Sequence, residues 1–269
     1  MTDTPRPAIV RVWIVPVGLP PATLARCRAV LDDRERARAA SFLSESDRRQ
    51  FTVAHGFLRI LAGLELGASP AALRWDAGPH GKPGLAAPWS ELSTSLSHSA
   101  GVVAVALAAG RAVGVDVERL ARRRDAAAMA ARFYPPDEAA WVAGGRDAGA
   151  RTAEAEHVTG DGDARARTAE AAYVTAQGDA GARADRFTWL WSRKEAVVKA
   201  AGGRLWPNLG IAVLGRDLIR CAEPDGEYRL ADVPAPVGFR AAVALAGAAP
   251  FAAQVAIWPS GAAAAAVTN

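Results

Sequence analysis

Residues 113–118 read VGVDVE and constrain this chain more than any other stretch. A valine at every second position predicts a β-strand with the valines on a core face and Asp116 and Glu118 together on the other. Mg²⁺ takes one or two carboxylates and completes its octahedron with water and substrate phosphates, so this pair suits Mg²⁺. A solvent-exposed strand face is the alternative, because the D-x-E pattern is common by itself.

A second charged motif follows in residues 187–200, FTWLWSRKEAVVKA. On the helix that this pattern predicts, Glu195 and Lys199 share a face, since they are four residues apart. A surface ion pair would give the same pattern. The chain has only three lysines, however, at 82, 194 and 199, against 29 arginines. Lysine is a compact point charge and arginine a planar fork, so we expect lysine where a point charge or proton donor is needed.

Two further segments can bind phosphate. Residues 95–99, SLSHS, offer hydroxyls and an imidazole as hydrogen-bond donors. A capped turn or a serine nucleophile would also fit, although no G-x-S-x-G elbow is present. Residues 81–84, GKPG, lack the glycine spacing and the following Ser or Thr of a Walker A loop, so an ordinary turn is the alternative.

The rest of the sequence predicts alternating helices and strands. We expect helices over 21–43, 45–66, 125–142 and 186–202, strands over 8–17, 102–107, 112–118, 211–215, 228–230, 237–245 and 252–258, and a loop over 76–84. Residues 144–185 are polar and contain two copies of a unit that begins ARTAEA, 16 residues apart. Two copies cannot bury a solenoid core, so we interpret this segment as a surface insertion.

Composition excludes several classes of protein. The 269 residues are 51% hydrophobic, yet no run of 18 apolar residues is free of charge, which argues against a membrane span. The N-terminus has no secretory pattern, and the two thiols, Cys27 and Cys221, fit a reduced cytosol better than a disulfide scaffold, so we expect a cytoplasmic protein. The two cysteines also lack metal-ligand spacing. A net charge of +4 without a dense basic stripe argues against nucleic acid as a partner.

Taken in order, G-K-P, S-L-S-H-S, G-V-D-V-E and W-S-R-K-E-A-V-V-K resemble the motif series of the Sfp-type (surfactin-synthetase-activating) 4′-phosphopantetheinyl transferases. The stretches DDRERARAASF and DRRQFTVAHGFLR are similar to the N-terminal region of that family. The resemblance implies transfer of phosphopantetheine from coenzyme A to a serine of a carrier protein, with Mg²⁺, releasing 3′,5′-ADP. It also implies an α+β fold of two pseudo-symmetric halves, residues 1–110 and 111–258, each a small antiparallel sheet with a long helix. The active site would lie in the cleft between them, and residues 259–269 would form a frayed tail.

Site residues are carried over from the resemblance by motif. It implies that Asp116, Glu118 and Glu195 hold Mg²⁺ and that Lys199 stabilises or protonates the leaving phosphate. Glu195 or a metal-bound water would take the serine proton. The coenzyme A contacts it implies are Arg38, His55, Lys82, Ser97, His98, Asp116 and Lys199.

The expected partners are coenzyme A and apo carrier proteins. Fatty-acid, polyketide and nonribosomal-peptide carriers all remain open. We expect a monomer, because both halves of the cleft lie in one chain. Two alternatives remain, namely another Mg²⁺-dependent phosphate-ester enzyme, such as a nucleotide phosphohydrolase, and a non-catalytic carrier-binding module.

Overall fold

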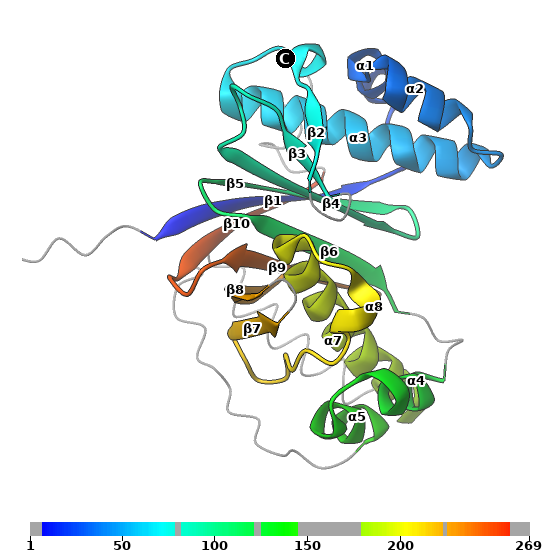
Figure 1. Cartoon of the computed structure of the whole chain (residues 1–269). Coiled ribbons are helices and arrows are strands. Elements are labelled where there is room, and N and C mark those ends of the chain that lie inside the picture. The colour runs from blue at the N-terminus through cyan, green and yellow to red at the C-terminus, as the bar shows by residue number, and fades with distance from the viewer. Residues whose placement is uncertain (1–6, 79–81, 121–124, 145–178, 223–224, 259–269) are drawn as a thin grey trace, which may run out of the picture.

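A computed structural model describes residues 7–78, 82–120, 125–144, 179–222 and 225–258. The chain is an α+β protein in four layers, helix, sheet, sheet and helix (Figure 1). One hydrophobic core lies between the two sheets, and each sheet packs a second core against its own helices. Among the described residues, no helix combines the length and apolar character needed to cross a membrane.

The first sheet has the strand order β10-β1-β5-β4. Its strands are β1 (Ala8–Pro16), β4 (Leu92–Ser99), β5 (Val102–Ala109) and β10 (Phe251–Ile257). Every pairing is antiparallel except that of β1 with β10. Its outer face is covered by α1 (Pro21–Val30), α2 (Asp33–Ala40) and the long α3 (Glu45–Leu66) (Figure 1). A short 3₁₀ turn, Pro70–Ala72, follows α3.

The second sheet is antiparallel throughout, with the order β6-β9-β8-β7. Its strands are β6 (Val113–Arg119), β7 (Leu218–Ala222), β8 (Asp225–Val233) and β9 (Phe239–Ala246). The long helix α7 (Asp179–Ala201) packs on its outer face, with α4 (Ala126–Phe133) and α5 (Pro136–Ala143) beyond it (Figure 1). A single turn, α8 (Leu205–Asn208), follows α7.

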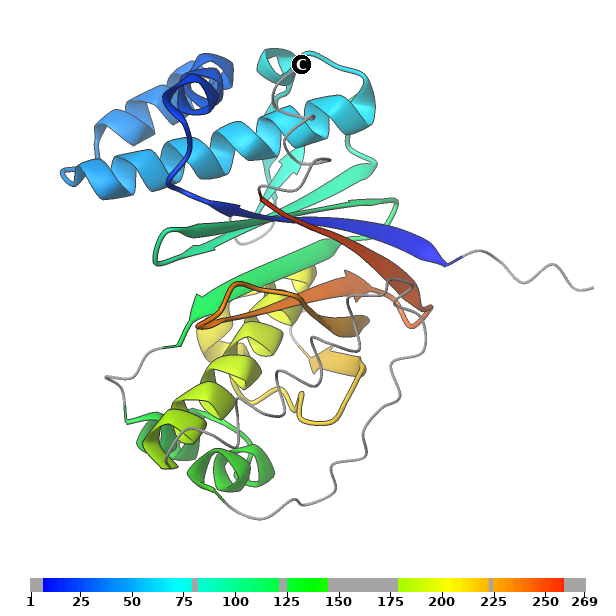
Figure 2. The same ribbon diagram turned by 180° about the vertical axis from the view of Figure 1, so that it is seen from behind.

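The last strand belongs to the first sheet although it lies at the other end of the sequence. β10 runs parallel to β1 over seven residue pairs, from Ala8 with Phe251 to Ile14 with Ile257. Figure 2 shows the two strands side by side. The division at residue 110 remains a prediction, but residues 251–257 lie in the sheet of the N-terminal half.

Several predicted boundaries were wrong for local reasons. The helix predicted over 21–43 is two helices, because Asp32 is extended and caps α2. Its side chain accepts from the Glu35 amide at 2.9 Å, and the Glu35 side chain accepts from the Asp32 amide at 3.1 Å. The helix predicted over 125–142 is likewise divided, into α4 and α5. The predicted loop 76–84 contains a short antiparallel pair, β2 (Trp75–Ala77) and β3 (Pro83–Leu85).

Two other differences concern the second half. The predicted strand 211–215 is a turn, because the buried Glu138 carboxylate accepts from the amides of Val213 and Leu214. Helix α7 begins at residue 179 rather than 186. Of the predicted insertion, residues 145–178 lie outside the described residues, as does the predicted tail 259–269.

Candidate metal and phosphate site

Strand β6 is buried on both faces. Its valines lie fully buried in the core between the sheets, as the alternation predicts. The opposite face is covered by α7 instead of being open to solvent. A Cβ on Gly114 would lie 2.0 Å from the carbonyl oxygen of Ala196 and 2.3 Å from the amide nitrogen of Ala200. Only glycine permits this approach, which brings the charged face of α7 against the carboxylates of β6.

Three carboxylates gather where β6 meets α7. One oxygen from each of Asp116, Glu118 and Glu195 lies within 4.8 Å of the others. Asp116 is 1% exposed. Its Oδ1 accepts from Ser97 Oγ and Lys199 Nζ, each at 2.6 Å, whereas its buried Oδ2 has no hydrogen-bond partner among the described residues. A buried carboxylate oxygen without a donor is a ready ligand atom for a cation.

Lys199 lies between two of these carboxylates. Its Nζ is 2.6 Å from Asp116 and 3.2 Å from Glu195, and it donates to Ser97 Oγ at 2.9 Å. Burial lowers the pKa of Lys199, but the two carboxylates outweigh burial and hold it above its usual value. Burial, reinforced by Glu195 and opposed by Lys199, raises the pKa of Asp116 to about 7. The cluster therefore favours bound positive charge.

Strand β4 positions the carboxylates with a row of serines at every second residue. Ser97 and Ser99 donate to Asp116 and Glu118 at 2.6 and 2.9 Å. The serine oxygens also accept from the free edge of β6: Ser93 from the amide of Val113, Ser95 from Val115 and Ser99 from Arg119, at 3.0 to 3.2 Å. The sequence indicated phosphate donors here. The spacing of 93, 95, 97 and 99 was the signal that one face of β4 contacts another element. This contact between the edge strands β4 and β6 is the seam between the two sheets.

The residues present fit a divalent metal. The carboxylates are hard oxygen ligands, and the Lys199 ammonium pairs with two of the three, Asp116 and Glu195. The unpartnered Asp116 Oδ2 supplies a ligand atom that no hydrogen bond occupies. The cluster could therefore hold a divalent cation between β6 and α7.

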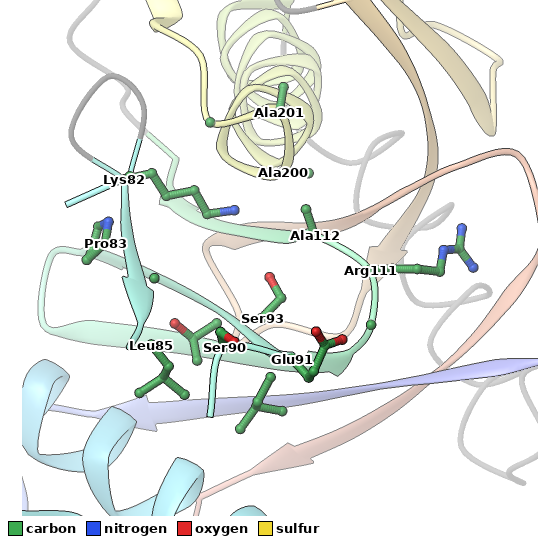
Figure 3. A pocket seen from close by; sticks show the side chains of 16 residues that line it. Lys82, Pro83, Leu85, Ser90, Glu91, Ser93, Arg111, Ala112, Ala200 and Ala201 are labelled. Carbon is green, nitrogen blue, oxygen red and sulfur yellow. The ribbon is translucent and has the colours of Figure 1, made fainter. Parts of the chain in front are cut away.

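Lys82 lies farther along the same seam. Its Nζ donates to the carbonyl of Val113 at 2.9 Å, and burial lowers its pKa to about 8. It lines a cavity of about 450 Å³, together with Ser93 and Ala112 and the α7 residue Ala200, next to Lys199. Figure 3 shows the Lys82 side chain extending toward Ala112. The cavity therefore lies where β4 begins and α7 ends, and the residues of the carboxylate cluster do not line it.

The other predicted coenzyme A contacts lie on the side of α3. His98 Nδ1 is 3.0 Å from Gln50 Nε2. The His55 ring stacks on Phe51, and its Nδ1 lies 3.2 Å from Glu35. Arg38, on α2, lies over a phenylalanine ring, at 4.9 Å from the ring centroid. No contact recorded among the described residues joins Arg38 or His55 to the metal-site carboxylates of Asp116, Glu118 and Glu195.

The site thus joins Asp116, Glu118, Glu195, Lys199 and Ser97 directly. These residues lie where the two sheets meet. The protein therefore has a carboxylate cluster suited to a divalent metal, next to cationic groups suited to phosphate. The sequence interpretation did not identify Gln50 or the role of Ser99, because both act through contacts between distant segments.

Comparison with known proteins agrees with this class. Residues 112–225 match the profile of the 4′-phosphopantetheinyl transferase superfamily, ACPS. The chain is 35% identical over 131 residues to "4′-phosphopantetheinyl transferase HetI" of Nostoc sp., covering 48% of this chain and 55% of that protein. It is 31% identical over 142 residues to "Phosphopantetheinyl transferase" of Thraustochytrium sp., covering 49% of each.

Residues 112–225 are therefore similar to the 4′-phosphopantetheinyl transferase superfamily, and the resemblance found in the motifs is confirmed. The matched segment contains Asp116, Glu118, Glu195 and Lys199. The chain spans about half the length of the curated relatives it matches.

Proposed function

We propose that this protein transfers 4′-phosphopantetheine from coenzyme A to a serine of an acyl or peptidyl carrier protein, in a Mg²⁺-dependent reaction that releases 3′,5′-ADP. The observation that carries the proposal is the cluster of Asp116, Glu118 and Glu195 with Lys199 among them. Both relatives named above are called phosphopantetheinyl transferases, which supports the same activity here.

The reaction breaks one phosphorus–oxygen bond and forms another. The carrier serine oxygen bonds to the phosphorus that carries pantetheine, and the bond from that phosphorus to the bridging oxygen breaks. The bridging oxygen leaves with 3′,5′-ADP. Bound Mg²⁺, held by Asp116, Glu118 and Glu195, would neutralise charge on the phosphoryl oxygens. The protein needs no nucleophile of its own. This agrees with the serines of β4, whose side chains hydrogen-bond to β6.

Glu195 and Lys199 have separate roles in this proposal. Glu195, at the edge of the cluster with 18% of its side chain exposed, takes the proton of the carrier serine. Lys199 has a raised pKa and stays charged near neutral pH. It therefore stabilises the leaving phosphate electrostatically more readily than it gives up a proton.

The phosphates of coenzyme A would lie along the seam that Lys82, Ser97 and His98 line. Arg38 and His55 would contact the 3′-phosphate from α2 and α3. In this arrangement the N-terminal half, residues 1–110, binds the nucleotide, and the C-terminal half, residues 111–258, supplies metal and catalytic groups. We also propose that the protein acts as a cytoplasmic monomer, because both halves of the cleft lie in one chain.

Release of 3′,5′-ADP, measured by chromatography with and without an apo carrier, tests the proposal. We expect release only when coenzyme A, Mg²⁺ and carrier are all present. Asp116→Ala and Glu195→Ala should each abolish most of it. Asp217→Ala, which removes an exposed carboxylate paired with Arg229, is the matched control and should release ADP normally. Release without carrier would indicate a phosphohydrolase, and carrier binding without release a non-catalytic module.

A further inference from the structure

The imidazole of His98 is tied to α3 by one side chain. Gln50 Nε2 lies 3.0 Å from His98 Nδ1, and Gln50 Oε1 accepts from the amide of Gly101 at 3.2 Å. A single glutamine therefore joins the N-terminal part of α3 both to the histidine and to the turn that follows β4.

The turn decides which way the glutamine amide faces. Ala100 and Gly101 connect β4 to β5, and both have positive φ, 44° and 84°, as in a two-residue hairpin turn. The Gly101 N–H can only donate, so the Gln50 atom that faces it must be the oxygen. The NH₂ group of Gln50 therefore faces His98.

The same reasoning fixes the proton on His98. An NH₂ group can only donate, so His98 Nδ1 must present its lone pair, and the neutral ring carries its proton on Nε2. A proton on Nδ1 of His98 would place its N–H group opposite the NH₂ group of Gln50, so that two donors would face each other. Rotating the amide to relieve that contact would break the bond from Gly101. No side chain is recorded as a hydrogen-bond partner of Nε2 in the described parts of the chain, so this donor is available to a ligand.

The surroundings of His98 lower its pKa overall. Although the side chain is exposed, partial desolvation lowers its pKa most, and a hydrogen bond with its own backbone opposes this. Coulombic interactions with Lys199 on α7 and His55 on α3 lower the pKa further. Asp47 on α3 opposes them. The lowered pKa and the contact with Gln50 therefore both favour the neutral ring.

We propose that Gln50 is a positioning residue that keeps His98 neutral, with its proton on Nε2, so that His98 meets an anionic ligand as a hydrogen-bond donor and not as a cation. That the ligand is a coenzyme A phosphate rests on the proposed function. The state of the ring follows from Gln50 and Gly101 alone, and it can be tested without activity.

The test is nitrogen NMR of the histidine rings in the ¹⁵N-labelled full chain, titrated with pH. The sequence has four histidines, and His98→Gln identifies the signals of His98 by their loss. In the unsubstituted protein we expect a lone pair on Nδ1, a proton on Nε2 and a pKa below the ordinary value of about 6.5.

Two variants separate positioning from structure. Gln50→Glu keeps an oxygen for the Gly101 amide but can only accept from His98. It should move the proton to Nδ1 and raise the pKa of His98 by about 1 to 3 units. Gln50→Met, which removes both contacts, should leave a mixture of the two tautomers. A proton on Nδ1 in the unsubstituted protein, or an unchanged tautomer and pKa in Gln50→Glu, would overturn the proposal.

Addition of 3′,5′-ADP tests the ligand separately. We expect the Nε2 signal of His98 to shift while Nδ1 keeps its lone pair. If the ring is neutral as described but ADP moves neither signal, the role toward the ligand is refuted while the action of Gln50 on the ring stands. If ADP binding protonates Nδ1, His98 acts as a cation and the proposal is wrong.

Discussion

Replacing Asp116 by asparagine should stabilise the metal-free protein, even though it removes a proposed metal ligand. Asparagine keeps an oxygen that can accept from Ser97 and Lys199 and removes the buried charge. The pKa of Asp116 is about 7 in the folded state against 3.8 in the unfolded chain. At about 1.4 kcal/mol per pKa unit, ionised Asp116 costs the fold about 4 kcal/mol.

The pH dependence has a definite sign. A carboxyl whose folded pKa is raised contributes stability that is fully present below its unfolded pKa and is lost as pH rises through the folded value. The advantage of Asp116→Asn should therefore be about 4 kcal/mol near pH 8 and fall to about 2 kcal/mol near pH 5, by the same linkage. Urea unfolding in EDTA at the two pH values measures this difference directly.

Magnesium should reduce the stability advantage of Asp116→Asn. At a concentration of 100 times its dissociation constant, Mg²⁺ stabilises the unsubstituted protein by about 2.7 kcal/mol, and it should stabilise Asp116→Asn far less. Three results would refute the reasoning: no gain for the variant in EDTA near pH 8, the same gain at both pH values, or equal stabilisation of both proteins by Mg²⁺.

Three further predictions follow from other contacts. Gly114→Ala should push α7 away from β6, cost about 1–3 kcal/mol and lower transfer, whereas Gly210→Ala, where a Cβ meets nothing within 4 Å, should do neither. Lys194→Met should lower the free energy of unfolding by about 3–5 kcal/mol, because the fully buried Glu138 carboxylate, 2.5 Å from Lys194, would lose its cationic partner. Adding Glu138→Gln should recover part of this loss. The KM for coenzyme A should rise above about pH 8, where Lys82 loses its proton.

Each of these has a contrary outcome. Equal denaturant midpoints for the two glycine variants would mean that α7 yields at no cost. A lysine variant as stable as the unsubstituted chain would show that the buried pair contributes nothing. A KM for coenzyme A that stays flat through the pKa of Lys82 would remove this lysine from phosphate binding.

Local patterns in the sequence predicted the parts of the site that depend on one element. Period two placed the valines of β6 in a core and Asp116 and Glu118 on the other face. Spacing by four placed Glu195 and Lys199 on one face of α7, and they form the expected ion pair. The apolar stripe over residues 45–66 predicted α3 with both of its bounds.

What could not be predicted depends on segments that meet across the fold. The alternating serines mark one polar face of β4, but they do not indicate that Ser99 holds Glu118, since that bond depends on two sheet edges lying side by side. The pairing of β10 with β1 joins the two ends of the described chain. Arg59 is fully buried and pairs with Asp32 and Glu35, which helps to hold the break that sequence periodicity missed between α1 and α2.

Intact mass of a purified apo carrier protein, incubated with this protein and coenzyme A, tests the central claim most directly. Parallel samples contain Mg²⁺ or EDTA, and Glu195→Ala replaces the unsubstituted protein in a third. We predict a gain of one phosphopantetheine group on the carrier in the Mg²⁺ sample alone. No gain on fatty-acid, polyketide and peptide-synthetase carriers, or an equal gain in EDTA, would contradict the account.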